Sequence, residues 1–163
     1  MGITFRPTGT FTLVYSADEA FADNVAARIA RKEYERHRDA SVFTPEMVRP
    51  GGALVKFTCE HLSRGALDYI DGLYTPNHRR VAAFRCGVTS MTGPGTETLV
   101  TKREDTVWGG KFLSEEAMDS ISGPGGFPMA VLYEIGGALL TKATLGDGEK
   151  KVSSPPRGSP SEE

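Results

Sequence analysis

The stretch FPMAVLYEIGGALLTKATL, residues 127–145, carries the clearest structural signal in this chain. Its apolar and small residues recur at steps of three and four, which is the period of one face of an α-helix. These positions are Met129, Leu132, Tyr133, Gly136, Leu139, Leu140 and Ala143. Pro128 suits a first helical position, because the N–H that proline lacks would have no partner there. The stretch therefore predicts an amphipathic helix around which the rest of the chain is organised.

Gly136 and Gly137 interrupt this helix with two poor helix formers. Each costs about 1 kcal/mol relative to alanine in a helix interior. One interpretation is that the glycines let another element pack closely, or kink the helix. The other is a docking groove for a protein partner. The residues that would line this groove are Met129, Leu132, Tyr133, Gly136, Leu139 and Leu140. The sequence favours close packing and leaves the groove as the candidate binding site.

The composition is typical of one domain with balanced charge. The chain has 163 residues, enough for one hydrophobic core without disulfides. Its 19 basic and 21 acidic side chains give a net charge of −2, which argues against a dedicated nucleic-acid or membrane-surface binder. No apolar run approaches the ~20 residues of a membrane span, and the N-terminal residues lack the pattern of a signal peptide. These properties predict a cytoplasmic protein.

The N-terminal part predicts a small antiparallel sheet followed by a helix. Residues 10–15 alternate between apolar and polar side chains as in a strand, and residues 3–5 are the expected hairpin partner. Ser16 stands three residues before Glu19, the spacing of a capping box. A charged helix is therefore expected over residues 17–40.

This helix has a thin apolar stripe and a densely charged second half. The expected stripe consists of Phe21, Val25 and Ile29. The segment Arg28 to Asp39 mixes acidic residues into a cluster of basic ones. A basic arm for nucleic acid would lack the interleaved acids, so a solvated helix face with ion pairs is the favoured interpretation.

Alternation and capping signals predict most of the following elements. Residues 41–52, with two prolines, are expected to form a loop, and residues 53–59 a half-buried strand. Ser63 and Asn77 are the expected N-caps of the next two helices, and Ser114 is that of a short later helix.

The second half of the chain contains breaks, a short strand and a polar end. Residues 91–97 are rich in turn formers, residues 99–102 suit a short strand, and residues 107–110 suit a loop. Residues 146–163 have too few apolar side chains to offset the entropy of ordering, so a disordered polar tail is expected there. The predicted fold is α+β, with a small N-terminal antiparallel β-sheet or hairpin packed with four to five helices. It forms a single domain over residues 1–145.

Four residues resemble the components of a thiol or zinc site: Cys59, His61, His78 and Cys86. A thiolate can be activated by a histidine only if the side chains meet, and Cys59 and His61 on one strand would lie about 7 Å apart. The spacing C-x-H, sixteen residues, then H-x7-C lacks the paired ligands of zinc motifs. Buried, inert thiols are favoured, with no metal and no cofactor. A small thiol or zinc enzyme remains an alternative.

No other catalytic motif is recognisable in the sequence. The serines lack the G-x-S-x-G context of a nucleophile elbow. The glycine clusters at residues 93–95 and 123–126 match neither phosphate-binding pattern, G-x-x-x-x-G-K-[ST] or G-x-G-x-x-G. The sequence therefore predicts a protein that is not an enzyme.

The order of elements from residue 55 to residue 152 resembles a known family. A strand leads into a helix (LVKFTCEHLSRGALDYI), a helix runs into a Gly-rich break (RRVAAFRCGVTSMTGPG), and the last helix carries E-I-G-G before a polar ending. This order is similar to that of the tail-assembly chaperones and related small tail-region proteins of long-tailed bacteriophages. The charged helix, Arg28 to Asp39, departs from the compact N-terminus of such proteins.

The resemblance implies a function and partners. It implies a non-enzymatic chaperone that binds the tape-measure protein in the host cytoplasm during tail assembly, with the tail-tube subunit as a second candidate partner. The alternative within the same setting is a structural head–tail or minor tail protein. Homo-oligomerisation is left open, and neither nucleic acid nor membrane is an expected partner.

Overall fold

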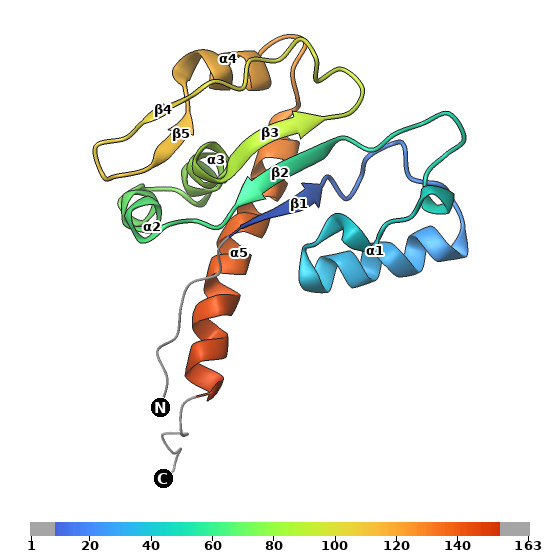
Figure 1. The fold of residues 1–163 in the computed structure, drawn as a ribbon, viewed down its shortest axis with the longest axis horizontal. Helices are drawn as coiled ribbons and strands as arrows, with labels where there is room; N and C mark the ends of the chain where they lie inside the picture. The colour runs from blue at the N-terminus through green and yellow to red at the C-terminus, as the bar shows by residue number, and fades with distance from the viewer. Residues whose placement is uncertain (1–8, 154–163) are drawn as a thin grey trace.

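The computed structural model describes the backbone of residues 9–153 and the side chains of residues 9–144. Within this part, five α-helices surround a three-stranded and a two-stranded antiparallel sheet, so the predicted α+β class is confirmed (Figure 1). The elements are β1 (Thr10–Val14), α1 (Val25–His37), η1 (Ala40–Val42), η2 (Pro45–Met47), β2 (Lys56–Glu60), α2 (Arg64–Asp71), α3 (Pro76–Gly87), β3 (Val88–Thr92), β4 (Arg103–Asp105), β5 (Lys111–Leu113), α4 (Glu115–Ser122) and α5 (Met129–Ser153).

The larger sheet has the order β1-β2-β3, with β2 in the centre and both pairings antiparallel. The register places Leu13 opposite Phe57, and Phe57 opposite Met91, so these apolar side chains share one face. That face is buried, and α5 runs behind the sheet with α3 beside it (Figure 1). The expected hairpin partner of β1, residues 3–5, lies outside the described residues.

The crossing of α3 and α5 is the most extensive contact between two helices in the described chain. A Cβ atom placed on Gly136 would overlap the backbone oxygen of Arg80, so only glycine permits this approach. At the next turn, a Cβ on Gly87 would come within 2.7 Å of the Leu139 side chain. Gly136 is therefore a packing glycine, which agrees with the interpretation that the sequence favoured.

The predicted start of α1 was wrong. The helix begins at Val25 rather than at residue 17, because Asn24 is its N-cap and accepts a hydrogen bond from the Ala27 N–H at 2.8 Å. Ser16 does not cap a helix. Its N–H and its hydroxyl both donate to the carboxylate of Glu134 on α5, each at 2.6 Å. A long-range partner thus replaces the local capping box that Ser16 and Glu19 predicted.

The predicted apolar stripe of this helix was also wrong at two of its three positions. Val25 and Ile29 are 61% and 64% exposed, whereas Phe21 is buried in the turn before the helix. The buried face of α1 instead ends in Tyr34. The Tyr34 hydroxyl accepts from the Val14 N–H at 2.9 Å and donates to the Val14 oxygen at 2.8 Å. These bonds turn the opposite face of α1 toward the sheet.

Local capping signals predicted two of the remaining helices correctly. The Ser63 and Ser114 hydroxyls accept from the N–H three residues ahead, each at 3.1 Å, and cap α2 and α4. For α3 the N-cap is Thr75 rather than Asn77, because Pro76 takes the first helical position.

The strands of the second half were predicted less well. β3 occupies part of the predicted break at residues 91–97, and β4 follows the predicted strand at 99–102 rather than coinciding with it. The expected loop at 107–110 is the turn of the β4–β5 hairpin. The predicted loop at residues 41–52 contains η2. The backbone of α5 continues to Ser153, so the expected tail of residues 146–163 falls outside the residues whose side chains are described.

The two neighbouring glycines of α5 should respond oppositely to the same substitution. Gly136→Ala should lower the free energy of unfolding by about 3 kcal/mol, because the added methyl group meets the Arg80 carbonyl. Gly137→Ala meets nothing closer than 3.7 Å and should raise stability by up to about 1 kcal/mol through helix propensity. Urea unfolding followed by circular dichroism measures both. Equal effects of the two substitutions would contradict the close crossing.

Candidate functional site

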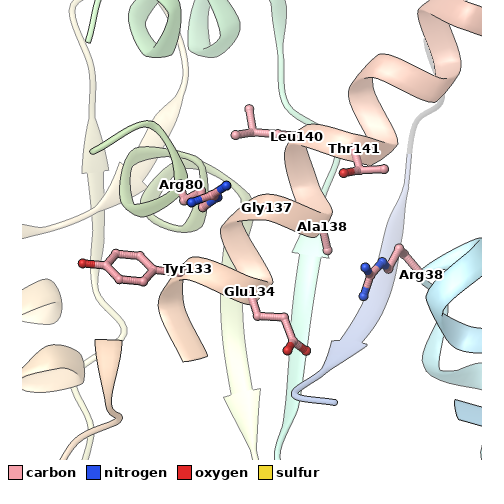
Figure 2. Close-up of a pocket in the computed structure, with 8 residues that line it drawn as sticks. All are labelled: Arg38, Arg80, Tyr133, Glu134, Gly137, Ala138, Leu140 and Thr141. Atoms are coloured by element: carbon pink, nitrogen blue, oxygen red, sulfur yellow. The ribbon is translucent and has the colours of Figure 1, made fainter. Parts of the chain in front are cut away.

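A pocket of about 400 Å³ lies along α5, and we call it the α5 pocket (Figure 2). Arg80 from α3 and Arg38 from the end of α1 line it together with one side of α5. The lining residues from α5 are Tyr133, Glu134, Gly137, Ala138, Leu140 and Thr141. The pocket is therefore lined by residues of three helices that are far apart in the sequence.

Half of the candidate binding residues of α5 are buried, and the other half are accessible to solvent. Leu132, Gly136 and Leu139 are buried in the core of the chain itself, so they cannot contact a partner while the chain is folded. Tyr133 and Leu140 are half-buried and line the α5 pocket. The other member, Met129, is 38% exposed at the start of the helix. The predicted groove thus stays a prediction only for the residues outside the core.

This division follows from the direction of the buried stripe on α5. Beside Leu132 and Leu139, the fully or nearly fully buried side chains are those of Val131, Ile135 and Ala138. The core therefore covers a broader and slightly rotated face than the apolar pattern predicted. Tyr133 and Leu140 lie at the margin of that face, where apolar atoms remain accessible.

Arg38 is a pocket residue that the sequence interpretation assigned to a solvated helix face. It ends α1 in the left-handed conformation, with φ of 52°, and its backbone N–H donates to the backbone oxygen of Tyr34 at 2.6 Å. The guanidinium lies over the Tyr34 ring at 5.7 Å from the centroid. Its Nε is buried and has no hydrogen-bond partner among the described residues. The αL backbone turns this side chain toward α5, and no sequence signal indicated that turn.

Arg80 reaches the pocket because α3 and α5 cross so closely. Its backbone oxygen lies against Gly136, and its Nε lies 3.7 Å from where a Cβ of Gly137 would stand. The guanidinium Nη1 donates to the Asn77 side chain at 2.9 Å. Figure 2 shows Arg80 and Arg38 approaching α5 from opposite sides in this view.

Glu134 is the acidic residue of the pocket, and its carboxylate is already occupied. Both oxygens accept hydrogen bonds from Ser16, whose own backbone oxygen accepts from Arg31 at 2.5 Å. Two guanidinium groups and one internally bonded carboxylate leave a net positive charge at the pocket. The arrangement is suited to an anionic group next to an apolar one.

Two of the four residues of the alternative enzyme are buried free thiols. Cys59 is fully buried, and burial raises the pKa of its thiol to about 12. Burial raises the pKa of Cys86 to about 11, although Arg85 and Arg103 act in the opposite direction. His61 packs against the Phe11 ring, with 4.7 Å between ring centroids. His78 is exposed, and no three His, Cys, Asp or Glu residues are grouped as metal ligands in the part of the chain that the structure describes.

Comparisons with known proteins found no match to this chain among protein-family models, curated proteins or solved structures. Within the described residues, none of the helices combines the length and apolar character needed to cross a membrane. The interpretation of function therefore depends on the geometry and charge of the α5 pocket.

The two thiols should be nearly inert in the folded chain. At about pH 8 a thiol with its pKa raised this far is almost entirely protonated, and the thiolate is the reactive form. We expect a disulfide reagent to modify both cysteines at least about 100-fold more slowly in the native chain than in concentrated urea. The absorbance of the released thiol measures both rates. Rapid modification of the native chain would restore the thiol-enzyme alternative.

His61 should make the stability depend on pH below neutrality. Burial, and to a smaller extent Lys142, lower the pKa of His61 below its ordinary value. The unfolded state therefore takes up a proton as pH falls below about 6.5 while the native state resists it, and stability decreases. Urea unfolding at about pH 7 and about pH 5 should show a smaller loss for His61→Gln than for the parent. The control His78→Gln removes an exposed imidazole instead, and an equal effect of the two substitutions would contradict the assignment to His61.

Proposed function

We propose that this chain is a non-enzymatic binding protein that holds a segment of a phage tape-measure protein along α5 during tail assembly. The resemblance described above suggests the partner, and the α5 pocket supports α5 as the proposed binding surface. The observation that carries the proposal is the presence of Tyr133 and Leu140, both half-exposed, beside two arginines on a firmly packed helix.

The chemistry of the pocket supports binding of a protein segment. Tyrosine and arginine are, with tryptophan, the side chains that are enriched among those that dominate the energy of protein interfaces. Tyr133 and Arg80 are side chains of these types, and Leu140 adds an aliphatic contact. The volume of about 400 Å³ is sufficient for one or two side chains of a partner.

The rigidity of the site supports the proposal as well. Gly136 fixes α5 against α3, and Glu134 fixes it to Ser16 at the end of β1. A surface that is already ordered loses little conformational entropy on binding, so more of the contact energy contributes to affinity. Binding to α5 therefore requires little rearrangement of the folded chain.

The buried thiols support the non-enzymatic part of the proposal. A cysteine nucleophile needs a lowered pKa and access to substrate, whereas Cys59 and Cys86 are buried and have raised pKa values. The proposal includes the host cytoplasm as the place of action and the tail-tube subunit as a second partner, both on the ground of the resemblance.

Two substitutions in the pocket test this function. Tyr133→Ala and Leu140→Glu should each weaken binding of a purified tape-measure segment at least about 10-fold, as measured by isothermal titration calorimetry. The matched control is Val107→Glu in the β4–β5 turn, where an exposed apolar residue likewise becomes acidic. This control should bind as the parent does, and far-UV circular dichroism should be native for all three variants.

Two results would reject the proposal. If no tape-measure segment binds the parent chain, the partner is wrong. If a segment binds and both pocket variants bind it as tightly as the parent, the place is wrong. Gly136 is not used in this test, because substituting it disturbs the crossing of α3 and α5 rather than the pocket alone.

A further inference from the structure

We infer that the α5 pocket is a receptor for a carboxylate, and that its occupant is an acidic side chain of the bound protein segment, held by Arg38 and Arg80. This inference rests on the proposed function for the existence of a bound segment. It adds the chemical group that the segment must present.

Arg38 has an unpaired hydrogen-bond donor and a defined orientation. Its Nε–H is buried and donates to no acceptor in the described chain, and because the atom has almost no accessible surface, a ligand reaches it only if the side chain moves. A buried donor without a partner is unfavourable, and native structures satisfy nearly all such groups. The side chain is already oriented by its stacking on Tyr34, so a ligand would not have to order it. A carboxylate matches the planar fork of a guanidinium and can accept two of its hydrogen bonds.

Arg80 supplies the second cationic group. The hydrogen bond from Nη1 to Asn77 uses one of its five N–H groups. Gly137 lines the pocket beside this guanidinium, and a Cβ there would stand 3.7 Å from Nε, at an ordinary contact distance. Gly137 thus differs from Gly136, because its position does not require glycine for packing.

The surrounding charges do not cancel these two arginines. Glu134 accepts its two hydrogen bonds from Ser16, which is uncharged, so it offsets one of the two positive charges of the pocket and leaves the other. Two other cations have partners of their own. Lys142 lies over the Phe11 ring at 4.6 Å, and Arg31 donates to the backbone oxygen of Ser16. The chain as a whole carries a net charge of −2. The positive charge is therefore local to the pocket, which distinguishes it from a generally basic surface.

The apolar neighbours favour a protein segment over a small anion as the occupant. Tyr133 and Leu140 lie on the same pocket as the two arginines. A free anion would leave these side chains exposed, whereas a peptide can place an aliphatic residue on them and acidic residues against the guanidinium groups. The expected ligand is accordingly an acidic, partly apolar segment.

A pair of synthetic peptides tests the inference without the natural partner. The first is an alanine-based helical peptide with one leucine and two glutamates four residues apart, and the second has glutamines in place of the glutamates. Titration of the full ¹⁵N-labelled chain is followed by NMR at the Arg38 and Arg80 Nε–H signals and the Gly137 amide. We expect the glutamate peptide to shift these signals and to bind at least about 10-fold more tightly than the glutamine peptide.

Substitutions with equal charge change give the matched control. Arg38→Gln and Arg80→Gln should each weaken binding of the glutamate peptide at least about 10-fold. Arg36→Gln removes a charge from the exposed side of α1 and should change the dissociation constant less than about twofold. Arg38→Lys keeps the charge without the fork and should recover part of the affinity. Amide spectra of the free variants verify that each is folded.

Four outcomes would overturn the inference. The first is equal binding of both peptides. The second is an equal loss of affinity for the glutamate peptide in Arg36→Gln and Arg38→Gln. The third is binding of free succinate as tight as that of the glutamate peptide. The fourth is a shift of the Arg38 and Arg80 signals in a Glu162→Gln, Glu163→Gln chain without peptide, which would assign the pocket to the chain's own C-terminal residues. Carboxylate binding together with failure of every tape-measure segment would reject the phage partner and keep the receptor.

Discussion

The close crossing of α3 and α5 is the contact on which the rest of the structure depends. Gly136 allows the Arg80 carbonyl to lie directly against the α5 backbone, and Leu139 fills the space over Gly87 one turn later. A side chain on Gly136 would force the helices apart, because the Arg80 backbone cannot move aside, whereas a side chain on Gly87 would displace the flexible end of Leu139. The crossing places α5 behind the three-stranded sheet, where its apolar stripe completes the core (Figure 1).

The same crossing creates the candidate site. It carries the Arg80 side chain past Gly136 to the open position beside Gly137, and the Glu134–Ser16 hydrogen bonds fix the other side of α5 to the end of β1. The Tyr34 hydroxyl binds both backbone groups of Val14, which orients α1 and thereby its C-cap, Arg38. Burial raises the pKa of Tyr34, so its hydroxyl remains a hydrogen-bond donor. Core packing and pocket geometry are thus set by one group of contacts.

Sequence patterns predicted the candidate site only in part. They identified the correct helix and two of its pocket residues, Tyr133 and Leu140, because helical periodicity places residues on a face. They did not separate the buried residues Leu132 and Leu139 from the accessible ones, since both kinds are apolar. They also assigned Arg38 to a solvated surface, because a basic residue among charged neighbours has no feature that predicts its partner.

The sequence by itself determined the α+β class, the long C-terminal helix and the capped starts of α2 and α4. These features depend on interactions within a few residues, such as the Ser63 and Ser114 caps and the spacing of apolar side chains. Only the tertiary structure decided where α1 begins, which of its faces is buried, and that Arg38 and Arg80 share one pocket. Each of these outcomes requires groups far apart in the chain, including Glu134 with Ser16 and Tyr34 with Val14, and their meeting is set by packing of the whole core rather than by local preference.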